Sequence, residues 1–149
     1  MNLITASPAF LVYTASMIVL CLNVLGLWAY SGSVRAKKKV TPNPEDIRTV
    51  ASGAQLGEDP PEVARVLRAH RNAADNILPF AILALLFVLW GGSALATAIF
   101  CGVFVIARLA HSAAYLAEKQ PFRTISFVVG GVDAIVLVGF LVKNLITSA

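Results

Sequence analysis

Residues 9–30 read AFLVYTASMIVLCLNVLGLWAY, a run of 22 residues without one charged side chain. A helix needs about 20 apolar residues to cross the hydrocarbon core of a bilayer. No basic residue precedes the run, and it is longer than the apolar part of a signal peptide, which is about 7–15 residues. We therefore interpret it as a retained membrane span, which ends at the basic residues Arg35, Lys37, Lys38 and Lys39.

Three further apolar stretches follow. The stretch 77–90 is too short to span alone, so its helix must begin earlier, while 93–116 and 124–142 are long enough. Only 13% of the chain is charged, against about 25% in soluble domains. We expect an all-α fold, an integral membrane bundle of four transmembrane helices in a single domain, residues 1–149. The expected helices cover about 8–34, 60–90, 93–117 and 123–145, with a cytoplasmic loop at about 36–59.

The basic residues predict the orientation of this bundle. Eleven of the twelve Lys and Arg residues lie between the first and second spans or around the turn between the third and fourth, and only Lys143 lies at the other end. Cytoplasmic loops carry the excess of positive charge. Both of these regions are therefore expected in the cytoplasm and both termini outside it. The lean loops favour a bacterial inner membrane. We expect membrane lipid as a partner of the protein. We expect no binding of nucleic acid.

Polar side chains gather at the same end of the spans. One helix face of residues 65–80, at three- and four-residue spacing, carries Arg65, Arg68, Asn72 and Asp75. Arg71 stands four residues before Asp75, a spacing that suits a salt bridge. A second stripe, in the third span, comprises Arg108, His111 and Tyr115. Further polar residues stand at the start of the fourth span and the end of the first: Arg123, Thr124 and Arg35.

The charges of these stripes do not balance. Five cations lie near the boundary, namely Arg65, Arg68, Arg71, Arg108 and Arg123, whereas the nearby anions are Glu62 and Asp75. A salt-bridge network inside the bundle would leave positive charge over, which is costly near a membrane. An anionic ligand would offset that cost through bidentate contacts. Lipid phosphate is one candidate. Glutathione is another, since its carboxylates, ammonium and amides suit arginines that stand beside Asn72 and Asp75.

Three other residues in the spans have side chains that can ionise. Asp133 lies in the fourth span and serves either as a polar tie between helices or subunits, or as a proton or ligand site. Cys21 and Cys101 both lie in apolar runs, and we expect them to be reduced and packed as small hydrophobes. No metal-binding spacing is present, so no metal site is expected.

Several motifs resemble those of one family. Residues 68–72, RAHRN, with Asp75 and Pro79-Phe80, resemble the second-helix signature of MAPEG proteins, the membrane-associated proteins in eicosanoid and glutathione metabolism. Residues 108–116, RLAHSAAYL, with 121–124, PFRT, resemble the microsomal prostaglandin E synthase type-1 branch of that family, as does 43–46, NPED. The resemblance covers essentially the whole chain, with its motifs in order.

The resemblance implies a homotrimer with glutathione as cosubstrate, bound in sites between neighbouring subunits that open to the membrane. Arg35 of one subunit would reach glutathione held mainly by the next. The implied holders of its charged and polar ends are Arg71, Asn72, Asp75, His111 and Tyr115. Arg68 and Arg108 would support or contact it. Arg123 would sit beside the sulfur, with Thr124 in place of a serine.

Departures from the family pattern leave the activity open. Asp75 replaces a glutamate, Thr124 a serine, and Phe127 a tyrosine of the prostaglandin synthase branch. Asp46 matches an aspartate linked with isomerisation, or serves as a loop or helix-cap residue. We expect a glutathione transferase acting on lipophilic electrophiles, which also reduces lipid hydroperoxides. The alternatives are a glutathione-dependent isomerase of endoperoxides, a lipid-binding protein without catalysis, and a small transporter or scaffold.

Overall fold

The computed structural model describes residues 7–148, and its frame is four long helices. They are α1 (Pro8–Lys38), α3 (Pro61–Leu89), α4 (Ala94–Leu116) and α5 (Phe122–Thr147). All four are long and apolar enough to cross a membrane. The expected four-helix membrane bundle is confirmed.

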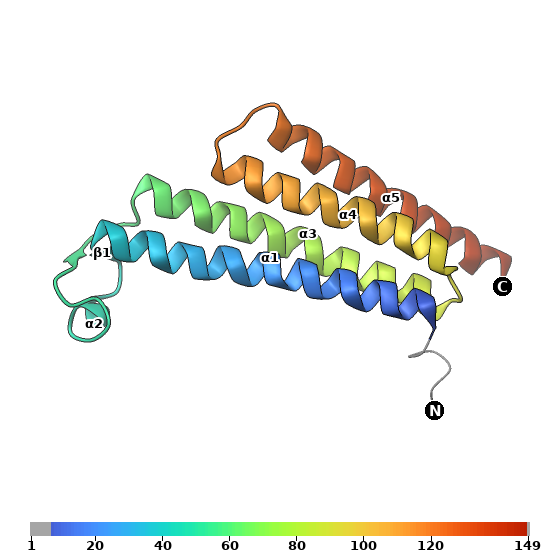
Figure 1. The fold of residues 1–149 in the computed structure, drawn as a ribbon, viewed down its shortest axis with the longest axis horizontal. Coiled ribbons are helices and arrows are strands. Elements are labelled where there is room, and N and C mark those ends of the chain that lie inside the picture. Colours follow the sequence, from blue (N-terminus) through green and yellow to red (C-terminus); the bar gives the residue numbers. More distant parts are fainter. Residues whose placement is uncertain (1–6, 149) are drawn as a thin grey trace.

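The helices run side by side and alternate in direction (Figure 1). The loop from α4 to α5 and the long connection from α1 to α3 lie at one end of the bundle. The start of α1 and the end of α5 lie at the other. All eleven basic residues counted above are therefore gathered toward one end of the molecule.

Local sequence explains where the helices begin. Ser7 caps α1 by accepting a hydrogen bond from the backbone of Phe10 at 3.2 Å, and Pro8 occupies the first helical position. Ser93 caps α4 in the same way. Pro60 stands at the cap position of α3 and makes no side-chain bond there. The preceding residue, Asp59, instead accepts hydrogen bonds from Arg35 of α1.

The turn between α3 and α4 is only four residues, 90–93. Gly91 adopts a φ of 85°, which favours glycine. A Cβ on Gly92 would lie 2.8 Å from the carbonyl oxygen of Phe87, so a side chain there would force the backbone apart. The two helices are therefore held closely together at this end.

The bundle interior is built from aromatic and small side chains. The rings of Phe80 on α3 and Phe104 on α4 stack at 3.7 Å, and Leu20 and Leu137 are fully buried. The outward faces are apolar as well: Ile135 is 72% exposed on a helix that can span a membrane. Lipid surrounds such faces in a bilayer, so packing rather than exclusion of water holds the helices together.

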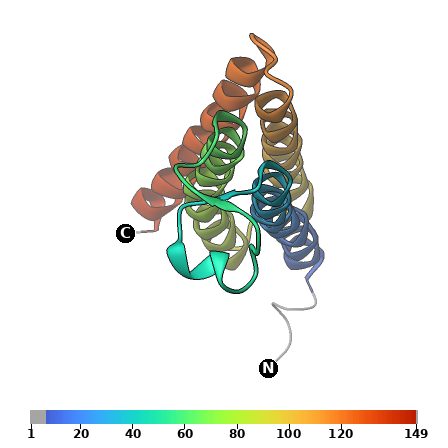
Figure 2. The same cartoon turned by 90° about the vertical axis from the view of Figure 1, so that its left-hand side faces the viewer.

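The connection between α1 and α3 folds into a small structure of its own (Figure 2). Two short parallel strands, β1 (Val40–Thr41) and β2 (Gln55–Leu56), pair with Val40 opposite Gln55. Between them lies α2 (Pro44–Ile47), a single helical turn. This segment covers the end of the bundle where α1 stops and α3 starts.

Candidate functional site

Arg108 lies almost wholly inside the subunit, with 1% of its surface exposed. Its guanidinium carbon is 5.7 Å from the ring centre of Phe104 and 5.5 Å from that of Phe127. No carboxylate pairs with it within residues 7–148. Its polar contacts are long, at 3.5 Å to Asn72 Oδ1 and 3.5 Å to the carbonyl oxygen of Ser126, and its buried Nε has no partner. The aromatic faces stabilise this cation without neutralising it.

A glycine on α5 makes the space for this guanidinium. A Cβ at Gly130 would lie 3.3 Å from Arg108 Nε and 3.4 Å from Nη2. Any larger residue would press on the guanidinium and on its contact with Asn72. The position of Arg108 therefore depends on the absence of a side chain on the neighbouring helix.

His111, one turn further along α4, holds the beginning of α5. Its Nδ1 lies 2.9 Å from the carbonyl oxygen of Arg123. A carbonyl only accepts, so Nδ1 donates, and the Nε2 of the neutral ring is left as an acceptor. That Nε2 is buried and has no hydrogen-bond partner among the described residues. The hydroxyl of Ser126 donates to the same carbonyl at 3.1 Å, so two side chains fix the first turn of α5.

Arg123 and Thr124 point into one small polar group at the start of α5. The guanidinium of Arg123 lies 4.9 Å from the ring centre of Tyr115. With the amide of Gln120 turned so that its oxygen faces Arg123, that oxygen lies 2.7 Å from Nη2. The amide nitrogen of Gln120 then donates to Thr124 Oγ1 at 3.1 Å. Gln120 thus links Arg123 and Thr124, the two residues for which the family resemblance implies a position near the sulfur of glutathione.

On α3, the polar stripe divides by burial. Asn72 is half-buried and faces Arg108, while Arg68, Arg71 and Asp75 are exposed at the surface of the subunit. The salt bridge expected between Arg71 and Asp75 is not formed within the part of the chain that the structure describes. A charged row thus stands open on one face of a helix long enough to span a membrane.

Two ion pairs that the sequence did not indicate consume part of the positive charge. Arg65 pairs with Glu118 from the turn before α5. Arg35 makes two bonds of 2.8 Å to the carboxylate of Asp59. Of the five arginines on α3, α4 and α5, four have no ion pair within residues 7–148: Arg68, Arg71, Arg108 and Arg123.

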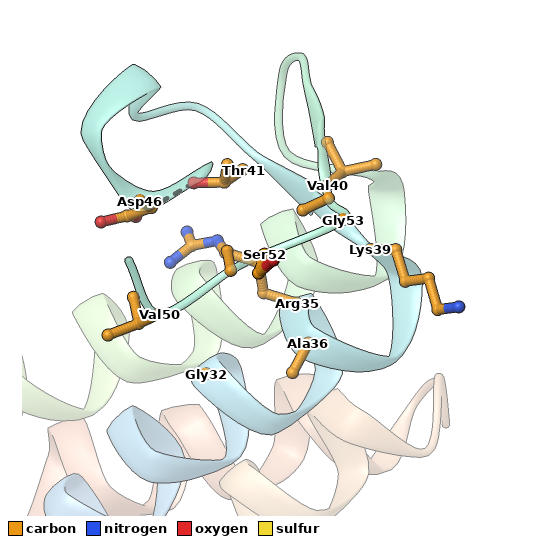
Figure 3. Close-up of a pocket in the computed structure, with 12 residues that line it drawn as sticks. Gly32, Arg35, Ala36, Lys39, Val40, Thr41, Asp46, Val50, Ser52 and Gly53 are labelled. Carbon is orange, nitrogen blue, oxygen red and sulfur yellow. Dashed lines mark hydrogen bonds between the residues drawn. The ribbon is translucent and has the colours of Figure 1, made fainter. Parts of the chain in front are cut away.

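Arg35 and Asp46 lie in a different place from the other predicted site residues. Both line a hollow of about 440 Å³ formed by the end of α1 and the following connection. Figure 3 shows the guanidinium of Arg35 directed toward Asp46. None of its lining residues comes from α4 or α5. Asp46 accepts bonds from Thr41 Oγ1 at 3.0 Å and Asn43 Nδ2 at 3.1 Å, and so it organises the loop.

Within one chain, the structure therefore brings together Asn72, Arg108, His111, Tyr115, Arg123 and Thr124 around the start of α5, and leaves Arg35 and Asp46 apart from them. Ser126, Gly130 and Gln120 also shape this group, and sequence reasoning missed them. Their type gave no signal, because small residues and a lone glutamine are common in any helix or turn. Only their contacts identify them.

Comparison with known proteins decides the family. The sequence model described as the MAPEG family matches residues 13–143. The chain belongs to the MAPEG family. It is 32% identical over 127 residues to prostaglandin E synthase of Homo sapiens, covering 85% of this chain and 83% of that protein. It is 32% identical over 128 residues to microsomal glutathione S-transferase 1 of Rattus norvegicus, covering 83% of each.

The resemblance drawn from the motifs is thus confirmed at the level of the family. The relatives of this chain include proteins named for two different reactions, a synthase and a transferase. Each of the two is 32% identical to this chain. Membership therefore establishes an integral membrane protein of a glutathione-linked family and leaves the reaction to be argued from the site.

Proposed function

We propose that this MAPEG protein is a glutathione-dependent membrane transferase that also reduces lipid hydroperoxides. The observation that carries the proposal is the set of four arginines on α3, α4 and α5 that have no ion pair within residues 7–148, one of them buried among aromatic rings. Unpaired cations near the hydrocarbon core of a membrane are costly in free energy, and an anionic partner lowers that cost. Glutathione offers two carboxylates for these cations. Its ammonium and amide groups can donate to Asp75, Asn72 and the free Nε2 of His111.

The site is completed, in this proposal, by a homotrimer. Arg68, Arg71 and Asp75 face outward from a spanning helix, where lipid contact would be costly. A neighbouring subunit that covers this face would bring its own Arg35 toward the glutathione. The site then lies near the cytoplasmic side of a bacterial inner membrane, with both termini outside the cytoplasm.

The chemistry follows from the group at the start of α5. Arg123, held over Tyr115 and next to Gln120, would favour the thiolate of glutathione over the thiol. The hydroxyl of Thr124 would donate a hydrogen bond to the same sulfur. The thiolate, the nucleophilic form, then attacks an electrophilic carbon of a lipophilic substrate. A carbon–sulfur bond forms, and the leaving group departs with its electron pair.

A second candidate is a glutathione-dependent isomerase of endoperoxides. The identity to prostaglandin E synthases favours it. Asp46 would then be a functional residue, although its carboxylate is engaged by Thr41 and Asn43. Consumption of glutathione separates the two reactions, because a transferase uses one molecule per turnover and an isomerase releases it unchanged. A lipid-binding member without catalysis would bind no glutathione at all.

The test is glutathione binding and turnover of 1-chloro-2,4-dinitrobenzene by purified protein in detergent. Arg123→Ala should lower turnover roughly a hundredfold, as expected for a lost charge next to the reacting atom, with little change in binding. Arg71→Ala should weaken glutathione binding by about tenfold or more. Arg48→Ala, an exposed residue of the connection, is the control and should behave as the parent protein. Absence of glutathione binding at millimolar concentration would rule out the proposal.

A further inference from the structure

A continuous groove runs along the outside of the helix pair α4 and α5. It consists of three adjoining hollows of about 360, 360 and 370 Å³. Val103 and Val129 line both the first and the second, and Val136 lines both the second and the third. We call this feature the α4–α5 groove and define it by Val103, Val129, Val132, Asp133, Val136 and Lys143.

The α4–α5 groove lies beside the glutathione site proposed above and shares Ser126 with it at the first hollow. Arg108, His111 and Arg123 line none of its three hollows. The two features use different faces of α5: Arg123 and Gly130 face the arginine side, whereas Val129 and Val136 face the groove. A molecule in the groove would therefore not occupy the site of thiol chemistry.

One carboxylate stands in the otherwise apolar wall of the second hollow. Asp133 is 9% exposed, and its Oδ2 is buried without a hydrogen-bond partner among the described residues. No cation pairs with it in residues 7–148. A carboxylate inside a membrane span is costly unless a donor reaches it. Because Asp133 lines the second hollow and is 9% exposed, an occupant of the groove can donate to the exposed part of this carboxylate, while Oδ2 stays buried.

A cation stands at the far end of the same groove. Lys143 lines the third hollow, and its side chain is exposed near the end of α5. It makes no ion pair in the part of the chain that the structure describes. Ten residues separate it from Asp133, which corresponds to about 15 Å along a helix. The groove thus offers a cation at its mouth, an apolar channel, and an acceptor at a fixed distance.

We propose that the α4–α5 groove binds a long-chain fatty acid with a hydroxyl group near the middle of its chain. The carboxylate pairs with Lys143, the chain lies along the valines, and the hydroxyl donates to Asp133. An extended chain advances about 1.2 Å per bond, as the protein backbone does. The spacing of 15 Å therefore places the hydroxyl on about the twelfth carbon.

The ligand requirement is tested with three fatty acids of equal length and purified protein in detergent. The affinities of stearate, 12-hydroxystearate and 2-hydroxystearate are compared by equilibrium dialysis. Hydrogen bonds to a charged acceptor are the strong class, so 12-hydroxystearate should bind about tenfold more tightly than the other two. Equal affinities of the three acids would overturn the proposal.

Variants then assign the preference to the residues named. Asp133→Leu should bind all three acids alike, with the affinity that the parent shows for stearate. Lys143→Gln should weaken all three by a similar factor. If the preference for 12-hydroxystearate survives in Asp133→Leu, the assignment is wrong. If Asp133→Leu instead changes the number of subunits, Asp133 joins copies of the chain and the groove proposal fails.

A steric pair of variants covers the case in which Asp133→Leu does not fold. Val129→Phe fills the groove where the first two hollows meet and should reduce binding of every acid. Ile135→Phe adds the same ring to an exposed position of α5 that lines none of these hollows and should have no effect. Equal binding by both variants would contradict the proposal. Because no glutathione is present, the outcome is independent of the function proposed above.

Discussion

Arg108 has its charge surrounded by hydrocarbon and aromatic rings, and its hydrogen bonds are too long to satisfy it. The rings of Phe104 and Phe127 and the empty space at Gly130 are what keep it in position. One of its two polar contacts is Asn72, which the proposed function places against glutathione. In the proposed function, the guanidinium would therefore act on the ligand partly by holding Asn72.

Gly130→Ala tests this dependence. The new methyl group would lie 3.3 Å from Arg108 Nε and should shift the guanidinium away from Asn72. We expect glutathione binding to weaken about tenfold, comparable to the loss of one charge-assisted hydrogen bond, while the helical circular dichroism stays unchanged. Gly131→Ala is the matched control, because a Cβ there has nothing within 4 Å. Equal affinities of the two variants would show that the position of Arg108 does not matter for the ligand.

At the scale of elements, two contacts fasten segments that are distant in the sequence. His111 on α4 fixes the first turn of α5 through the Arg123 carbonyl. Arg35 near the end of α1 fixes Asp59, two residues before α3 begins, with two hydrogen bonds. The second contact joins the two ends of the long connection between α1 and α3. It thereby positions β1, α2 and β2 over the end of the bundle.

Loss of that contact should loosen the connection. In Asp59→Ala, we expect trypsin to cleave after Arg48 several times faster than in the parent protein, because local opening exposes the loop backbone. Glu62→Ala removes the neighbouring pair with Lys38, whose two side chains are exposed. Exposed pairs contribute about 0–1 kcal/mol, so this control should be cleaved at nearly the parent rate. Rates of limited proteolysis measured by mass spectrometry distinguish the two variants.

At the scale of the whole molecule, the exposed row on α3 and the separate position of Arg35 both point beyond one subunit. Arg35 lies in a hollow that no residue of α4 or α5 lines. If one glutathione needs both Arg35 and Arg71, the proposed trimer supplies them from neighbouring chains. This arrangement is heterologous, since each subunit gives one residue to the next in a ring.

Mixed trimers test that geometry. At a glutathione concentration well below the parent Kd, trimers of Arg35→Ala or of Arg71→Ala subunits alone should each turn over about tenfold more slowly than the parent or worse, because each lacks one contact to glutathione. When equal amounts are co-assembled, about a quarter of the sites in a random ring combine an intact Arg35 with an intact neighbouring Arg71. We expect about a quarter of the parent turnover to return. Recovery of no activity would place both arginines in the same subunit's site.

The fold could be predicted from the sequence because a span of apolar residues has few alternatives in a bilayer. Helical spacing also predicted which side chains of one helix share a face. It correctly put Arg108, His111 and Tyr115 on one side of α4. Helical spacing does not say which residue of another element lies opposite. For that reason, the pairs Arg65–Glu118 and Arg35–Asp59 and the fit of Gly130 to Arg108 emerged only from the structure.

The Arg71–Asp75 pair shows the opposite limit of helical spacing, a contact that the spacing allows and the structure does not form. The spacing allowed a salt bridge, yet both side chains lie exposed on the subunit surface and do not meet. Such pairs are worth only about 0.2–0.5 kcal/mol on a helix. That is too little to hold an exposed arginine side chain in one geometry against the carboxylate.

The four-residue turn at 90–93 has a consequence for how the protein enters the membrane. So short a connection, without charge, favours insertion of α3 and α4 as a unit over insertion as independent segments. We therefore expect the two helices to cross the membrane together as a helical hairpin. Arg108, costly in a lone helix, then enters the bilayer with Asn72 and the stacked pair of Phe80 and Phe104 already beside it. Lengthening this turn would remove that protection during biogenesis, even if the finished bundle tolerated it.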